Sequence, residues 1–293
     1  MNAQEQTPAL RFAREFSANR LALAGAAMLV LILLAALTAP LISPQNPYDL
    51  AQLDILDSKL APGAPGATGM MHWLGTDDQG RDMLSAIFYG LRISLLVAAL
   101  ATLAALAIGM AVGLAAAYAG GAPDALIMRI VDIQLSFPSI LIALVLLAVT
   151  GQGVDKIVIA LIAVQWAYYA RTVRSVALVE KRKEYVDAAL CLGYSTPRIV
   201  LRHILPNCLP PMIVVAMVQV AHAITLEATL SFLGLGAPIT SPSLGLLIAN
   251  GFTHLLSGKY WISFFPGIAL LITLVSINLV GDHVRDVLNP RFK

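Results

Sequence analysis

The stretch KEYVDAALCLGYSTPRIVLRHILP, residues Lys183–Pro206, places helix and turn signals between two apolar runs. Apolar side chains recur at i, i+3, i+4 and i+7, which predicts a short amphipathic helix over Glu184–Leu192; these positions are Tyr185, Ala188, Ala189 and Leu192. Gly193 tolerates the left-handed conformation that ends helices, and Ser195-Thr196-Pro197 supplies a hydroxyl cap and a proline that favour a new helix. The sequence therefore predicts a helix–glycine–helix elbow (residues 184–205), and we expect Pro206 to bend the chain beyond it.

Long uncharged runs lie on both sides of the elbow. A membrane helix needs roughly 20 mostly apolar residues, and five stretches reach this length: Leu21–Ile42, Ile93–Gly120, Ile133–Val154, Ile204–Leu226 and Tyr260–Gly281. A sixth run, Ile157–Ala170, is shorter, and its length alone also fits a re-entrant or interfacial segment. The whole chain is 58% hydrophobic and only 12% charged, about half the charge of a soluble domain. This composition argues against a soluble enzyme or a disordered tail, and it predicts an all-α polytopic membrane protein.

Charge assigns the sides of the membrane. Arg171–His203 contains seven Lys and Arg residues against three acidic ones, and the positive-inside rule places such a segment in the cytoplasm. Six transmembrane helices, with N and C termini cytoplasmic, keep this segment inside, so Ile157–Ala170 is predicted to cross. The apolar face of the elbow then fits either a partner protein or the lipid surface. Membrane lipid is an expected partner, whereas a net charge of +2 is too small for nucleic acid.

Motifs for covalent chemistry are missing from the sequence. Cys191 and Cys208 form no CxxC pair, which argues against a disulfide framework and a zinc site. Gly258-Lys259 lacks the rest of a Walker A loop. Glu227 and His222 are five residues apart, about 140° around an ideal helix, which is unfavourable for an intramembrane catalytic pair. We therefore expect no catalytic residue, no metal and no cofactor. A passive channel would leave the apolar elbow in a basic loop unexplained.

The outer loops give weaker predictions. The loop from about Ser43 to Leu91 carries six aspartates, and the cluster Pro62–Gly69 predicts a flexible tether. Thr76 or Asp77 is expected to cap a helix lying along the membrane surface, with an apolar stripe of Met83, Leu84, Ile87 and Phe88. The alternating acidic ligands of an EF-hand are absent. The loop at about Gly234–Lys259 either covers a cavity or simply connects two spans.

Several polar side chains lie within the apolar runs. Charged groups at this depth are costly and usually face a cavity or a partner. A translocation path would use Gln165, Tyr169, Gln219, His222 and Glu227. The alternative for Glu227 is a structural hydrogen bond that anchors the Ser231–Gly236 turn, and a lone membrane histidine is more often a packing residue. Gly109 and Gly113 predict a close helix approach, within this chain or against a partner.

Several motifs carry a family resemblance. The run Asp187-Ala188-Ala189, followed by Gly193 and Leu205-Pro206, resembles the EAA loop of permease subunits in bacterial ABC importers. Two positions depart from that pattern, because Asp187 replaces a glutamate and His203 replaces an isoleucine. Three other segments are similar to the C-type permease of the dipeptide/oligopeptide/nickel family: WLGTDDQGRD (Trp73–Asp82), EATLSFLGLG (Glu227–Gly236) and GDHVRDVLNPR (Gly281–Arg291).

The resemblance implies a MetI-like ABC permease core over residues 92–285, containing a cytoplasmic coupling loop at 178–206. It would follow a cytoplasmic segment 1–20, a first transmembrane helix 21–42 and an extracytoplasmic loop 43–91, and precede a cytoplasmic tail 286–293. The residues implied in ATPase coupling are Glu184, Tyr185, Asp187, Ala188, Ala189, Leu192, Gly193, Leu205 and Pro206.

The same resemblance implies a multi-pass subunit of the bacterial inner membrane that makes and breaks no covalent bond. Its expected partners are a second, B-type permease subunit, two cytoplasmic ABC ATPase subunits and an extracytoplasmic solute-binding protein. The expected activity is import of dipeptides or short oligopeptides by alternating access. The alternative is import of nickel or another small solute, such as glutathione or an opine-like compound.

Overall fold

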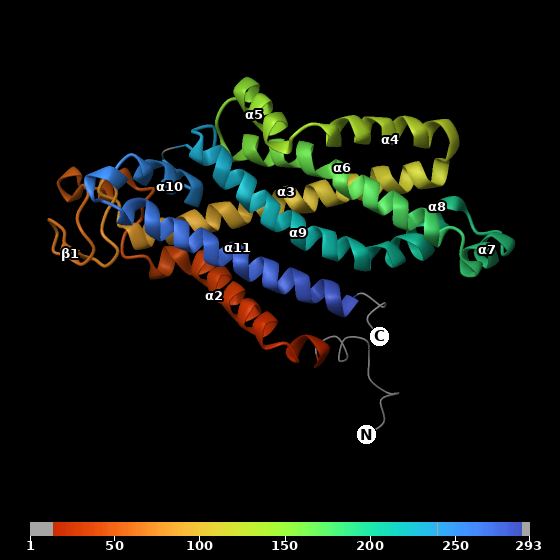
Figure 1. Ribbon diagram of the computed structural model, residues 1–293, viewed down its shortest axis with the longest axis horizontal. Helices are drawn as coiled ribbons and strands as arrows, with labels where there is room; N and C mark the ends of the chain where they lie inside the picture. The colour runs from red at the N-terminus through yellow and green to blue at the C-terminus, as the bar shows by residue number, and fades with distance from the viewer. Residues whose placement is uncertain (1–13, 239, 289–293) are drawn as a thin grey trace.

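The computed structural model describes residues 14–238 and 240–288, and it shows an elongated bundle of helices (Figure 1). The predictions for residues 1–13 and 289–293, which include part of the N-terminal segment and of the tail, lie outside the described residues. Four long helices form the body: α3 (Met83–Ala119), α6 (Val154–Glu180), α9 (Leu205–Phe232) and α11 (Trp261–Leu288). A further helix, α2 (Arg20–Ile42), packs mainly along α11. The all-α class is confirmed.

The predicted span Ile133–Val154 is wrong as a single helix. The structure has α4 (Gly121–Ser136) and α5 (Ser139–Thr150), which meet at an angle of 90°. Pro138 explains the break, because the residue before a proline is pushed out of the helical region. Phe137 accordingly has an extended backbone, with φ −93° and ψ 142°.

Membrane-crossing length is met by α2, α3, α9 with its preceding turns, and α11, and the bent pair α4 and α5 would add a fifth crossing. The short apolar run Ile157–Ala170 is the first part of α6, which continues through a charged stretch to Glu180. At 1.5 Å per residue, the 27 residues of α6 extend over about 40 Å, which is long enough for a bilayer. Six crossings therefore remain a prediction.

Two glycines of α3 face another helix of the same chain at close range. A Cβ atom on Gly109 of α3 would lie 2.6 Å from the carbonyl oxygen of Trp166, and one on Gly113 would lie 2.5 Å from that of Ala170. Both neighbours belong to α6, so the two glycines let the backbones of α3 and α6 approach. Of the two predicted uses of these glycines, packing within the subunit is the one observed.

The segment after α2 is folded, not a loose tether. It contains the turns η1 (Leu50–Gln52) and η2 (Ile55–Asp57), then β1 (Ala64–Pro65) paired antiparallel with β2 (Met71–His72). Its end also corrects the predicted surface helix, because Met83 begins α3 and the helix continues unbroken to Ala119. Asp82 caps α3 by accepting from the Ser85 amide at 2.9 Å. We call residues 43–82 the outer segment.

The elbow lies at the opposite end of the bundle from β1 and α10 (Leu244–Phe252) (Figure 1). It consists of α7 (Glu184–Cys191), α8 (Thr196–Ile199) and a π-turn, η3 (Val200–Ile204), that leads into α9. The expected bend at Pro206 is therefore replaced by an irregular turn just before it, and Pro206 lies in the first turn of α9. A last short turn, η4 (Leu255–Ser257), precedes α11.

Candidate coupling elbow and cavity

The turn of the elbow has the geometry that the sequence predicts. Gly193 has φ +71°, and its amide donates to the Leu190 carbonyl at 2.9 Å while the Tyr194 amide donates to the Ala189 carbonyl at 3.2 Å. These two bonds form a Schellman motif, in which a glycine takes the left-handed conformation that other residues avoid. Gly193 thus ends α7 and fixes the angle to α8.

The faces of α7 differ in part from the prediction. Val186 and Ala189 are buried against the protein's own core, together with Ile199 of α8. The expectation that a partner protein or lipid covers the apolar face of the elbow is therefore wrong for Ala189, which the chain itself covers, and Tyr185 is half-buried as well. The side chains left exposed are Glu184, Asp187, Ala188, Leu190, Cys191 and Leu192. Leu192 is 70% exposed, so this second face is the one available to a partner.

The elbow is tied to the end of α3 by polar contacts. The Tyr118 hydroxyl donates to Thr196 Oγ1 at 3.0 Å, and Lys181 Nζ lies 4.7 Å above the Tyr118 ring. Within the elbow, the Arg198 guanidinium lies 4.1 Å from the centre of the Tyr194 ring. Leu205 packs against the same core, whereas Pro206 is exposed.

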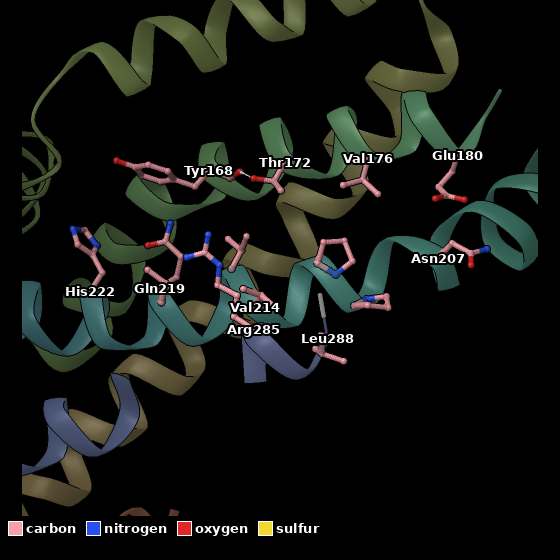
Figure 2. Close-up of a pocket in the computed structure, with 14 residues that line it drawn as sticks. Tyr168, Thr172, Val176, Glu180, Asn207, Val214, Gln219, His222, Arg285 and Leu288 are labelled. Atoms are coloured by element: carbon pink, nitrogen blue, oxygen red, sulfur yellow. Dashed lines mark hydrogen bonds between the residues drawn. The ribbon is translucent and has the colours of Figure 1, made fainter. Parts of the chain in front are cut away.

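A cavity of about 970 Å³ lies between α6, α9 and α11. Figure 2 shows one face of α6 turned to it, with side chains at steps of four residues: Tyr168, Thr172, Val176 and Glu180. The α9 wall is largely valine and proline, with polar groups at Asn207, Gln219 and His222, while α11 contributes Arg285 and Leu288. The lining runs from Glu180 and Asn207, beside the elbow, to Tyr168 and His222, near the middle of α6 and α9, so the cavity reaches the elbow end of the molecule.

The predicted path residues divide into two groups. Gln219 and His222 line the cavity, whereas Gln165 and Tyr169 do not. Gln165 is fully buried between helices and donates to the Gln219 carbonyl at 3.1 Å. Adjacent helical residues point about 100° apart, so Tyr168 faces the cavity while Tyr169 packs into the core.

Glu227 is absent from the cavity wall and completely buried. It accepts hydrogen bonds from the hydroxyls of Ser94 on α3 and Ser231 on α9, both at 2.7 Å. Ser231 Oγ in turn accepts from the Ala237 amide at 3.4 Å. Of the two predictions for Glu227, the structure supports the structural bond that anchors the turn after α9.

Sequence reasoning missed Thr172, Glu180, Asn207 and Arg285 as cavity residues. The α6 residues follow a four-residue spacing, which would have found them if Val154–Glu180 had been taken as one helix. Arg285 lies more than 60 positions beyond Gln219 in the sequence, and only the packing of α11 brings it to the cavity. Among the described residues, no group of three His, Cys, Asp or Glu side chains is placed to hold a metal ion.

Comparison with known proteins gives a consistent result. A family model described as "Binding-protein-dependent transport system inner membrane component" matches residues 105–293, and one described as "N-terminal TM domain of oligopeptide transport permease C" matches residues 7–62. The dipeptide transport system permease protein DppC of Escherichia coli (strain K12) is 41% identical over 98% of this chain and 94% of its own. DppC of Bacillus subtilis (strain 168) is 35% identical over 96% of this chain and 85% of its own.

The fold is also similar to solved structures. One chain from inward-facing crystal forms of the MetNI methionine ABC transporter superposes with a TM-score of 0.58 at 21% identity. The match covers 70% of this chain and 97% of the other. A second crystal form gives a TM-score of 0.57 at 20% identity. At this identity the likeness concerns the fold, and it confirms the expected MetI-like core.

Proposed function

The chain belongs to the inner membrane components of binding-protein-dependent transport systems, the permeases of ABC importers, and we propose that it imports dipeptides or short oligopeptides. Permeases of this family work with an ATPase and a solute-binding protein, and ATP is hydrolysed in the separate ATPase subunits. Multiple candidate membrane helices place the chain in the inner membrane as a multi-pass protein. The chain is 41% and 35% identical to two dipeptide permeases over nearly its whole length, which supports a peptide substrate.

The observation that carries this proposal is that the cavity and the elbow share two helices. The elbow joins α6 to α9, and the same two helices provide most of the cavity wall. A displacement of α7 by a bound ATPase would therefore move both sides of the cavity together. Because the cavity reaches the elbow end of the molecule, we infer that this form opens toward the predicted cytoplasmic side.

The lining of the cavity suits a short peptide of variable sequence. Its volume of about 970 Å³ is at the upper end of small-molecule sites. Arg285 carries a charge that complements the terminal carboxylate of a peptide, and Gln219 and His222 can exchange hydrogen bonds with peptide groups. The valine and proline wall makes no demand on side-chain polarity. For a nickel ion, the lining offers one imidazole, that of His222, and the carboxylate of Glu180 is already paired with Lys183.

Membership of the family supports a proposal for the composition of the complex. We propose a second, B-type permease beside this chain, two ATPase subunits at the elbows and a solute-binding protein on the outer segment. The coupling contacts would be made by the exposed face of α7, chiefly Glu184, Asp187, Ala188 and Leu192. Val186 and Ala189 would hold α7 to the permease, so that the motion is transmitted. Residues 92–285 are proposed as the permease core.

Uptake into proteoliposomes tests the function. The complex, reconstituted with its ATPases and a solute-binding protein, should accumulate a radiolabelled dipeptide when ATP is supplied. ADP in place of ATP should abolish the accumulation. Uptake of labelled nickel with no uptake of dipeptide would contradict the peptide assignment while leaving the permease assignment in place.

The orientation of the elbow has its own test. Ser195 is exposed at the turn of the elbow, so Ser195→Cys should react with a membrane-impermeant maleimide only from the cytoplasmic side. Cys191 is exposed nearby and is first replaced by serine. Labelling should be strong in inside-out vesicles and at least tenfold weaker in intact spheroplasts. Equal labelling in spheroplasts would refute the cytoplasmic placement of the basic segment.

A further inference from the structure

The hydroxyl of Tyr185 joins three helices at the end of the cavity nearest the elbow, which we call its mouth. Tyr185 belongs to α7, and its hydroxyl donates to Glu180 Oε2 at the end of α6 with a distance of 2.6 Å. The same hydroxyl oxygen accepts from Asn207 Nδ2 in the first turn of α9 at 3.3 Å. A single hydroxyl on the elbow thus links the helix that enters it to the helix that leaves it.

Both partners of Tyr185 belong to the cavity wall. Glu180 and Asn207 line the end of the cavity nearest the elbow, as Figure 2 shows, and they come from opposite sides of it. Two further bonds hold this pair: Lys183 Nζ lies 2.7 Å from Glu180 Oε1, and Asn207 Nδ2 also donates to the His203 carbonyl at 2.7 Å. The separation of α6 and α9 at the mouth is therefore set by side-chain bonds that pass through α7.

The protonation of the pair is well defined. Burial and the hydrogen bond to Glu180 raise the pKa of Tyr185 to about 12, so its hydroxyl keeps its proton at neutral pH. Desolvation acts to raise the pKa of Glu180, but the bonds from Lys183 and Tyr185 outweigh it and lower that pKa below the ordinary value. The contact is therefore a charge-assisted bond from a neutral hydroxyl to a carboxylate, a stronger kind than a neutral pair.

We propose that Tyr185 is a positioning residue that transmits the movement of α7 to the mouth of the cavity. The proposal rests on the importer function above. When a bound ATPase displaces α7, the hydroxyl carries Glu180 and Asn207 with it, and the ends of α6 and α9 change their separation. Without the hydroxyl, α7 still docks through its exposed face, but its displacement reaches the mouth only through apolar packing.

Tyr185→Phe tests this proposal because it removes one oxygen and keeps the ring. The number of peptides taken up per ATP hydrolysed should fall about tenfold, the factor expected for loss of bonds of this kind. The second readout does not depend on transport. In an otherwise wild-type chain, Thr172→Cys on the cavity wall should change its labelling rate when ATP binds. When Tyr185→Phe is added, this ATP-dependent change should largely disappear.

Tyr118→Phe is the matched control. Its hydroxyl also bonds across to the elbow, at Thr196, but neither residue lines the cavity. This variant should keep the ATP-dependent change in labelling and the wild-type ratio of uptake to hydrolysis. An equal loss in Tyr118→Phe and Tyr185→Phe, or no loss in Tyr185→Phe, would overturn the proposal.

A double variant separates the link from two unrelated effects. If the two bonds act as one link, Tyr185→Phe with Asn207→Ala should be scarcely worse than the more damaging single variant. Independent, multiplicative losses would contradict the link. Should wild type take up no peptide, the proposed function fails, yet the labelling at Thr172 still decides whether Tyr185 transmits the movement of α7.

Discussion

The two ends of the molecule are built from opposite kinds of polar contact. In the outer segment a cluster of polar side chains is buried: His72 is fully buried, with its ring nitrogens 3.1 Å from Asp82 and 3.9 Å from Asp57. At the elbow, by contrast, the ion pair of Lys183 and Glu180 includes a lysine side chain that is 51% exposed. Most of the polar side chains of α7 also face solvent.

This difference indicates different mechanical roles. A buried polar network is costly to break, because a group left without its partner keeps its desolvation penalty. The outer segment is also held to α11, since Trp261 Nε1 donates to the Thr76 carbonyl at 3.2 Å. Bonds at a solvated surface exchange with water at little cost. The outer end is therefore suited to be a fixed cover, and the elbow to be a joint that moves.

The largest effect is expected from Asp82→Ala in the outer segment. Asp82 accepts from His72, from the Ser85 hydroxyl and from the Ser85 amide, and it is 1% exposed. Its removal leaves Nδ1 of the buried His72 without its hydrogen-bond partner and α3 without its cap. We expect the free energy of unfolding to fall by about 3–5 kcal/mol, measured as thermal and chemical unfolding in detergent.

Asp78→Ala provides the control for that loss. Asp78 is the exposed neighbour in the same acidic run, so its replacement should change the free energy of unfolding by less than about 0.5 kcal/mol. Equal losses for the two variants would mean that the outer segment is no more rigidly held than the elbow, and the comparison would fail.

At the elbow, Gly193→Val should impair coupling more than stability. No atom lies within 4 Å of a Cβ placed on Gly193, so the cost is the left-handed backbone alone, about 1–2 kcal/mol for a branched residue. The complex should assemble and hydrolyse ATP, while peptide uptake per ATP falls at least fivefold. Gly193→Asn, whose side chain tolerates this conformation, should retain most of the uptake. Normal uptake by an assembled Gly193→Val complex would contradict the role of the elbow as a moving joint.

The sequence was sufficient for the elements with strong local rules. The Gly193 stop, the α7 helix and the apolar long helices follow from periodicity and from glycine geometry, and the structure reproduces them. The short run Ile157–Ala170 was harder, because α6 extends into a charged stretch that hydropathy does not include. Pro138 was visible in the sequence, but an uncharged run of sufficient length concealed its effect.

The cavity was less predictable, because its wall depends on which side of each helix faces inward. Glu227 illustrates this: a lone acid in an apolar run fits a path, yet two serine hydroxyls from α3 and α9 satisfy it within the core. Arg285 illustrates the converse, since only the packing of α11 against α9 turns this arginine in the last turn of α11 toward the cavity. Val186 was overlooked for the same reason. The predicted stripe of α7 began at Tyr185, and Val186, the next residue, points about 100° away around the helix.

The smallest effect is expected from Asp187→Arg on the exposed face of α7. Asp187 has no hydrogen bond or ion pair from its side chain within the described part of the chain, so the permease itself should keep its stability. The substitution inverts a charge in the surface proposed to dock with the ATPase. Exposed pairs contribute up to about 1 kcal/mol, so we expect the ATPase to bind about fivefold more weakly, measured by co-purification at increasing salt.

Asp282→Arg is the control for this reversal, because Asp282 is an exposed acid near the end of α11, on another helix and outside the elbow. It makes the same change in net charge, so a general electrostatic effect on the ATPase would appear in both variants. Weaker binding only for Asp187→Arg would place the docking surface on the exposed side of α7. Unchanged binding for Asp187→Arg would instead mean that this side faces lipid or solvent, and the elbow would lose its role as the joint to the ATPase.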